Sequence, residues 1–199
     1  MLEKNAPTGV PVHELLTRRW SPRAFDPARN ISKDQRAALL EAARWAPSAN
    51  NSQPWRYIVC DKSVNEAGWR KAFDCLGAGN QAWCKNVPLL LLSCTATVNP
   101  DGKPARYGMH DTGMANLSLM LEALAQGLAA HAMAGFDADK ARAAFGIPAE
   151  FSPVAMIAVG YQASPDILDA AVKEKELTPR ARRSVADSFF GSEWGSSLG

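Results

Sequence analysis

The ten residues Ala46–Trp55, APSANNSQPW, join two segments with different periodicity. Before them, Ser32–Gln35 has the form of a capping box, with serine at the N-cap and glutamine at N3, and apolar residues such as Leu39 and Ala43 recur at helical spacing. After them, Arg56–Cys60 reads RYIVC, a short β-rich run. The stretch itself carries proline, serine and asparagine, which favour turns. It therefore predicts a helix that ends at the first proline, a rigid polar loop and a strand.

The rest of the chain alternates helical and strand patterns. The apolar run Val87–Cys94, VPLLLLSC, is typical of a strand that is buried on both faces. We also expect a short helix over 12–18, a short run over 131–134, a helix over 137–145 and a strand over 154–161. This mixture predicts an α+β fold in one layered domain.

The longest predicted helix runs from Asp111 to Leu128, with Gly127 as a plausible terminator. A helix as apolar as this one must be buried, and a second copy of itself could cover it. The apolar surface of the helix is extended around it by Ala115, Leu119 and Ala125. Its large apolar residues recur at steps of three and four, at Met114, Leu117, Leu121, Leu124 and Leu128.

Composition excludes several classes of protein. The chain has 199 residues, 47% of them hydrophobic, which is enough for one domain with a substantial core. The formal net charge is +2, so charge gives no reason to expect a nucleic-acid or membrane-surface partner. No run approaches 18 apolar residues, and the polar N-terminal region lacks the apolar core of a signal peptide. We expect a cytoplasmic protein without a membrane span.

The four cysteines, Cys60, Cys75, Cys84 and Cys94, contain no C-x-x-C pair. Structural zinc and a disulfide framework are therefore not expected, and the thiols are predicted to lie in or near the core.

The region 164–199 has no strong helical or strand period, yet it carries a basic cluster, PRARR at Pro179–Arg183, and the aromatic residues Phe189, Phe190 and Trp194. Large aromatics rarely stay exposed. We interpret residues 1–199 as a single domain whose segment 164–199 is an arm that wraps a partner subunit.

Arg19, Ser21 and Arg23 alternate along a segment that Pro22 biases toward extended backbone. Alternate residues of an extended chain point to the same side, so two guanidinium groups and a hydroxyl could bind one phosphate. A charged surface turn is the alternative.

The loop between Ser48 and Gln53 offers several hydrogen-bonding groups without formal charge. Such a set would suit a ligand with uracil-like edges and ribityl hydroxyls. The alternative is a loop that satisfies its own hydrogen bonds.

No side chain is predicted as a catalyst or metal ligand. Gly77–Ala82 matches G-x-G-x-x-A, but no strand precedes it, so it is rejected as a dinucleotide fingerprint. The histidines His13, His110 and His131 are far apart in the sequence. The pair His110 and Asp111 is interpreted as a helix start, and an acid/base pair is the alternative. An enzyme with this profile takes its chemistry from a cofactor.

Two blocks together resemble the flavin-dependent nitroreductase family: RRWSPRAFD at Arg18–Asp26 and EAARWAPSANNSQPWRYIV at Glu41–Val59. Later features match in the same order, including HAMAGFD at His131–Asp137 and PRARRSV at Pro179–Val185. The resemblance covers Val12 to Trp194. It implies an α+β fold with a mixed sheet flanked by helices, in an intertwined homodimer with long central helices and FMN at the subunit interface.

The resemblance also assigns residues to the FMN phosphate. Arg183 could replace Arg182 by a shift of one residue, because Ser184 stands where proline is common in the family. The residues that match phosphate-binding positions come from both ends of the chain: Arg19, Ser21, Arg23, Arg180 and Arg182.

A second set matches positions around the flavin ring. Ala132 stands where the family often has proline, and the position of Ala134 often holds a bulkier or acidic residue, which implies a more open pocket. Segments 61–76 and 99–107 vary in the family and would shape substrate choice. The matching residues are Pro47, Ser48, Ala49 and Asn51 from the partner subunit, Asn80, and the backbone of Ala134 and Gly135.

The implied activity is transfer of reducing equivalents from NADPH or NADH, through FMN, to nitroaromatic, quinone or related small acceptors by a ping-pong mechanism. Three alternatives remain open at this point. They are a family branch with another substrate (dehalogenation or flavin breakdown), a non-catalytic flavin-binding regulatory protein, and an interaction module that binds no flavin.

Overall fold

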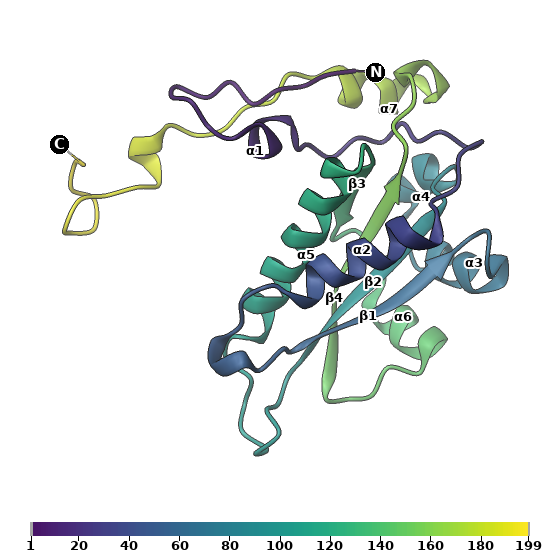
Figure 1. Cartoon of the computed structure of the whole chain (residues 1–199), viewed down its shortest axis with the longest axis horizontal. Coiled ribbons are helices and arrows are strands. Elements are labelled where there is room, and N and C mark those ends of the chain that lie inside the picture. The colour runs from purple at the N-terminus through teal and green to yellow at the C-terminus, as the bar shows by residue number, and fades with distance from the viewer. Residues whose placement is uncertain (1, 199) are drawn as a thin grey trace.

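A central antiparallel sheet organises the fold in the computed structural model, which describes residues 2–198 (Figure 1). Within these residues four strands pair in the order β1-β2-β4-β3, and all three pairings are antiparallel. The strands are β1 (Trp55–Asp61), β2 (Leu89–Ala96), β3 (Ala129–Met133) and β4 (Phe151–Gly160).

The α+β class is confirmed, but the sheet of the described residues is antiparallel and not mixed as expected. The reason lies in the order of the strands. Strands β2 and β3 run in the same direction, because both are antiparallel to β4, and the helix α5 (Gly108–Ala125) lies between them in the chain. Strand β4 arrives last and takes the place between them, so the two parallel strands never pair.

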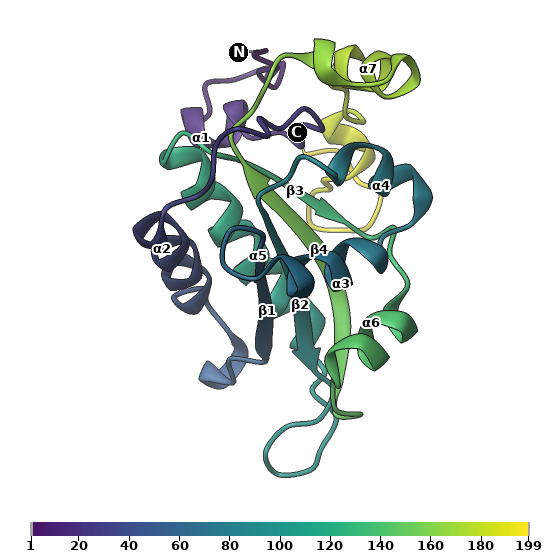
Figure 2. The ribbon, with the colours of Figure 1, turned by 90° about the vertical axis from the view of Figure 1, so that its right-hand side faces the viewer.

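Helices cover both faces of the sheet (Figure 2). Leu89 and Leu91 of β2 pack in one cluster with residues of α2 (Lys33–Arg44) and α5, whereas Leu90 and Leu92 point to the opposite cluster. That second layer contains α3 (Glu66–Asp74), α4 (Ala78–Cys84) and α6 (Ala138–Phe145). All four leucines are fully buried, which confirms a strand buried on both faces.

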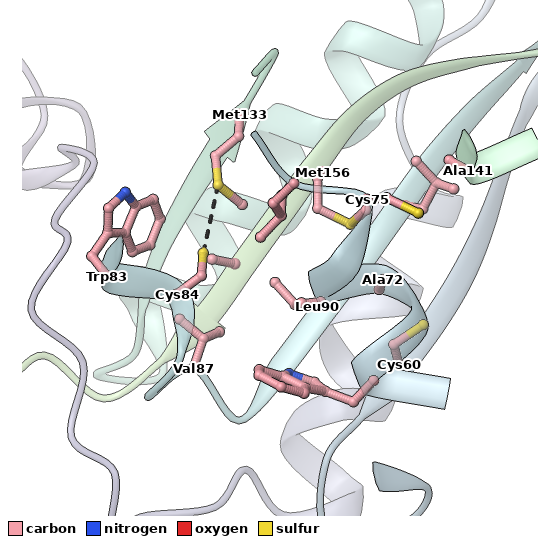
Figure 3. Close-up of a cluster of buried hydrophobic side chains, with 14 of the residues drawn as sticks. Cys60, Ala72, Cys75, Trp83, Cys84, Val87, Leu90, Met133, Ala141 and Met156 are labelled. Atoms are coloured by element: carbon pink, nitrogen blue, oxygen red, sulfur yellow. Dashed lines mark hydrogen bonds between the residues drawn. The ribbon is translucent and has the colours of Figure 1, made fainter. Parts of the chain in front are cut away.

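All four cysteines are buried free thiols, as the sequence predicts. They belong to the cluster of buried side chains in the layer with α3 and α4, and Figure 3 shows Cys60, Cys75 and Cys84 there. The Sγ atom of Cys84 lies 3.7 Å from the Sδ atom of Met133. Burial raises the pKa of the Cys60 and Cys94 thiols to about 11. These side chains therefore act as small apolar groups at neutral pH.

Most helix ends follow local signals. Ser32 and Gln35 form both hydrogen bonds of the expected capping box at the start of α2. Helix α5 begins three residues before the predicted start and ends at Ala125, with Gly127 just beyond it at a φ of 72°, a conformation that glycine adopts without strain. The predicted short helix is α1 (Glu14–Arg18).

One chain buries only part of the apolar surface that the sequence predicts for α5. Within one chain the helix buries Ala115, Leu119 and Ala123, while Leu117 is 44% exposed and Leu121 is only partly covered. Small residues let α5 lie close to the sheet. The stripe of large apolar residues is consequently left partly open.

Three helices were not predicted: α3, α4 and, in the region 164–199, α7 (Ala170–Leu177). The described residues also form the short 3-10 turns η1 (Ala49–Asn51), η2 (Pro165–Ile167) and η3 (Val185–Asp187). Beyond α7 the chain extends away from the helices and sheet (Figure 1), and Trp194 is 93% exposed. A search of the described residues finds no helix long and apolar enough to cross a membrane.

Candidate functional site

Basic side chains from both ends of the chain meet at one place. Arg19 follows directly after α1, and Arg180 and Arg182 follow α7. Partial burial lowers the pKa of the Arg19 guanidinium, and the neighbouring charges of Arg180 and Arg182 lower it further. The structure thus brings together three of the arginines that the sequence assigns to a phosphate.

This arginine cluster (Arg19, Arg180 and Arg182) lacks a neutralising carboxylate. Among residues 2–198, no acidic side chain lies within 4.0 Å of any of the three guanidinium groups. Arg180 donates from one nitrogen to the carbonyl oxygens of Lys4 and Thr17, both at 2.7 Å. Arg19 and Arg180 are partly buried, whereas Arg182 is exposed. Partly buried cations without a counter-ion favour binding of an anion, and arginine suits phosphate because its N–H groups form a planar fork.

Arg23 lies beside the cluster but has a carboxylate partner that the sequence did not reveal. Its guanidinium is 3.7 Å from the carboxylate of Glu176, a residue of α7 that is fully buried. This distance is too long for a hydrogen bond, so the N–H groups of the Arg23 guanidinium are not used by the ion pair. The hydroxyl of Ser21 has no hydrogen-bond partner among residues 2–198, and that side chain is partly buried.

His131 on β3 lies close to Arg19 and Arg23. Its ring stacks on Trp83 with centroids 4.7 Å apart, and its Nδ1–H donates to the carbonyl oxygen of Pro22 at 2.9 Å. Burial lowers the pKa of His131 to about 4, and the charges of Arg23 and Arg19 act in the same direction. The imidazole is therefore neutral at physiological pH.

His131 should make folding stability depend on pH. Its folded pKa of about 4 lies below the ordinary value of 6.5, so between these values the unfolded chain binds a proton that the folded protein excludes. The stability that His131 contributes is fully present above pH 6.5 and is lost as the pH falls toward 4. We expect a loss of about 1–3 kcal/mol over this window. Urea unfolding across this pH range measures it, and His131→Asn should flatten the curve; equal slopes in both proteins would contradict the assignment.

A second set of predicted residues meets at the other end of β3. The side-chain amide of Asn80 donates to the carbonyl oxygen of Gly135 at 2.9 Å, and the N–H of Gly77 donates to the same oxygen at 3.0 Å. The N–H of Gly135 has no partner among residues 2–198, and both Gly135 and Ala134 are exposed. Gly135 is thus held through its carbonyl oxygen, while its own N–H is available to a ligand.

The two sets lie along the edge of the sheet, because β3 pairs on only one side. Gly135 follows His131 by four positions, which corresponds to about 13 Å of extended chain. A ligand with a phosphate at one end and a polar ring at the other could reach both sets. The G-x-G-x-x-A match falls between α3 and α4 rather than after a strand, so its rejection as a dinucleotide fingerprint is confirmed.

The polar loop after α2 has an unusual backbone. Asn50, Asn51 and Gln53 have positive φ values of 52°, 55° and 46°. Such angles cost energy in residues other than glycine, and they concentrate at functional sites. The hydroxyl of Ser48 accepts the N–H of Gln53 at 3.1 Å, so part of the loop does satisfy its own hydrogen bonds.

A buried carboxylate at the start of α5 holds this loop. Asp111 is 1% exposed and accepts the N–H of Ala49 at 2.9 Å, and its other oxygen lies 2.9 Å from Nδ1 of His110. Sequence reasoning explained the pair His110 and Asp111 as a helix start, which is correct but omits the tether.

Removing the tether should destabilise the protein. Asp111→Ala leaves the Ala49 N–H without its acceptor, and we expect a loss of about 1–3 kcal/mol of unfolding free energy. Urea denaturation provides the measurement. Asp139→Ala removes an exposed carboxylate of α6 that makes no hydrogen bond or ion pair within residues 2–198, and it is the matched control, expected to change stability by less than about 0.5 kcal/mol. Equal effects of the two variants would rule the tether out.

Within one chain this loop and the arginine cluster occupy opposite ends of α5. Ala49 is tied to Asp111 in the first turn of the helix, whereas Arg19 shares a cavity of about 160 Å³ with Leu124 and Leu128 at the other end. A helix rises about 1.5 Å per residue, which separates the two ends by roughly 20 Å. The loop residues therefore do not join the arginine cluster in a single chain; they are Pro47, Ser48, Ala49 and Asn51.

A larger cavity, of about 590 Å³, lies between the loop and segment 99–108. Its lining includes Asn50, Asn51, Arg106 and Tyr107. The segment that we expect to shape substrate choice thus lies directly against the loop. No group of three or more His, Cys, Asp or Glu side chains in residues 2–198 is arranged to hold a metal ion.

The fold and these residues define an α+β protein in which three arginines without a carboxylate partner among residues 2–198 gather near a sheet edge, with exposed polar backbone groups further along that edge. The sequence profile of the nitroreductase family matches residues 16–161, and the chain belongs to that family. The expected resemblance is confirmed.

Solved and curated relatives agree with this assignment. A crystal structure described as an oxidoreductase containing FMN superposes with a TM-score of 0.90, is 34% identical, and the match covers 99% of this chain and 100% of the other. Protein DrgA of Synechocystis is 27% identical over 83% of this chain and 89% of its own length. The oxygen-insensitive NAD(P)H nitroreductase of Salmonella typhimurium is 26% identical over 44% of this chain and 40% of its own length.

Proposed function

We propose that this chain transfers reducing equivalents from NADPH or NADH to nitroaromatic, quinone or related small acceptors in a ping-pong cycle. The family and its relatives support the underlying activity, that of an FMN-dependent NAD(P)H oxidoreductase of the nitroreductase family.

The observation that carries the FMN assignment is the arginine cluster. Arg19 is partly buried beside two further guanidinium groups, and no carboxylate of the described residues neutralises them. The phosphate of FMN is an anion of the right chemistry for three such groups. We assign Arg19, Arg180 and Arg182 to the phosphate, with Arg23 and the free hydroxyl of Ser21 at its side.

The residues around Gly135 fit the ring of the same molecule. The free N–H of Gly135 and the amide of Asn80 supply fixed donors, and exposed Ala134 leaves room above them. When bound, FMN supplies the redox chemistry, and no side chain need act as the catalyst. The chain's own part is to orient the ring and to place a backbone donor where negative charge builds up.

A homodimer would complete the site. The loop at Pro47–Asn51 lies about 20 Å from the arginine cluster of its own chain, so we propose that it covers the ring bound by a second copy. The partly open stripe at Leu117 and Leu121 on α5 supports this proposal, because an apolar helix face needs a partner. Residues 1–199 would then be one domain whose arm, 164–199, wraps the second copy. The second copy would cover the exposed aromatic residues of the arm.

We propose the cytoplasm as the compartment. The four cysteines are free thiols, which suits a reducing environment.

An absorption spectrum tests the proposal directly. The purified chain with FMN should show a bound-flavin spectrum after gel filtration, and anaerobic NADPH or NADH should bleach it; a quinone or nitroaromatic should then restore it. A bound flavin that resists both nicotinamides would favour the non-catalytic alternative. Rapid bleaching without reoxidation by these acceptors would favour a family branch with another substrate. A chain that takes up no FMN would contradict the assignment.

A further inference from the structure

The carboxylate of Glu176 is fully buried, although it lies on a short helix near the end of the chain. An ionised carboxylate without partners in such a place would cost several kcal/mol, so its contacts must compensate. It is one of the few buried charged groups of the described residues, and the redox chemistry makes no use of it.

Its partners all belong to the predicted phosphate segment. The N–H of Arg23 donates to Oε1 at 2.9 Å and to Oε2 at 3.0 Å, and the N–H of Ala24 donates to Oε1 at 3.2 Å. The guanidinium of Arg23 completes the set at 3.7 Å. One carboxylate therefore fixes both the backbone and the side chain of Arg23, across 153 residues of sequence.

The backbone of Glu176 is also tied into the neighbourhood. Its carbonyl oxygen accepts from Nζ of Lys4 at 2.7 Å, while the carbonyl oxygen of Lys4 accepts from Arg180 at 2.7 Å. Arg180 in turn belongs to the arginine cluster around Arg19. Glu176 thus contacts residues from both ends of the chain, and these are the ends that supply the arginines of the cluster.

We propose that Glu176 is a positioning residue for the FMN phosphate: it holds Arg23 and Ala24 in place so that the cations from both chain ends converge. The inference rests on the proposed function. It makes a prediction opposite in sign to simple electrostatics. Removing a negative charge beside a phosphate should strengthen binding by Coulomb's law, whereas losing the fixed position of Arg23 should weaken it. We expect the weakening to prevail, because two backbone N–H groups lose charged acceptors.

The test uses Glu176→Gln in the full-length chain, with Glu174→Gln as the matched control, since Glu174 makes the same chemical change at an exposed position of the same helix. Affinities for FMN and for riboflavin, which lacks the phosphate, are measured by quenching of flavin fluorescence. Glu176→Gln should weaken FMN binding about 10-fold, the scale of one hydrogen bond to a charged group, and change riboflavin binding less than about twofold. Glu174→Gln should leave both affinities unchanged.

The outcomes separate this inference from the function itself. Wild-type protein that binds neither flavin contradicts the proposed function. Wild-type protein that binds FMN, with Glu176→Gln equal or tighter, overturns the inference alone. Equal loss of FMN and riboflavin also overturns it, because a general loss of structure would not single out the phosphate. Should Glu176→Gln fail to fold, Glu176→Asp is tested, which keeps the charge but moves the carboxylate away from Arg23 and Ala24. The same selective loss of FMN affinity is expected. An unchanged ratio of FMN to riboflavin affinity would refute the inference.

Discussion

A double variant with Arg19→Ala and Arg180→Ala should bind FMN roughly two to four orders of magnitude more weakly than the wild type. Each hydrogen bond to a charged group contributes about 1.5–3 kcal/mol, and each 1.4 kcal/mol is a factor of ten in affinity. The two arginines come from opposite ends of the chain and meet without a neutralising carboxylate among the described residues. Fluorescence titration of the full-length protein with FMN measures the change.

Three controls make the result specific. Riboflavin affinity should change little in the double variant, because riboflavin has no phosphate. Arg70→Ala removes an exposed arginine of α3 and should leave FMN binding unchanged. Arg183→Ala tests the register of the basic segment: Arg180 and Arg182, not Arg183, act on Arg19, so its loss should cost less than that of Arg182. A double variant that still binds FMN within threefold of wild type would remove the basis for the phosphate site.

Trp83→Ala should cause the largest loss of stability, about 3–5 kcal/mol of unfolding free energy. Trp83 is 2% exposed and stacks between Phe25, at a centroid distance of 5.9 Å, and His131, at 4.7 Å. Truncation leaves a cavity at the junction of the arginine-bearing segment, α4 and β3. In urea denaturation the midpoint should fall by about 1–3 M.

The matched truncation is Val64→Ala, at a position that is 70% exposed in the turn before α3. It should change stability by less than about 0.5 kcal/mol. A Trp83→Ala protein that unfolds at the wild-type urea concentration would show that this stack does not support the fold.

Where the sequence carries strong local signals, the prediction of the fold succeeds. The capping box at Ser32 and the apolar run of β2 gave the right elements within about two residues, because hydrogen bonds and burial at these places depend on neighbours in the chain. Helix α7 was missed because its residues, AAVKEKEL, show little separation of apolar and polar faces. It is held in place by Glu176, whose partners lie 153 residues away.

The contacts within the candidate site are of the same long-range kind. Spacing alone places Arg19 and Arg23 on one segment, but their meeting with Arg180 and Arg182 depends on how α7 and the N-terminal segment pack. The buried tether at Asp111 could not be distinguished from an ordinary acidic residue at a helix start. The leucine stripe of α5 was recognised as apolar, yet periodicity cannot say which apolar face meets the sheet and which is left for a partner.

A crystal structure of the full-length protein grown with FMN tests the central claim most directly. The account predicts phosphate oxygens about 2.7–3.2 Å from the guanidinium nitrogens of Arg19 and Arg180 of one chain, with the loop at Pro47–Asn51 of a second copy against the ring. A phosphate that faces solvent while these arginines make no contact with it, or FMN bound at another place, would contradict the account.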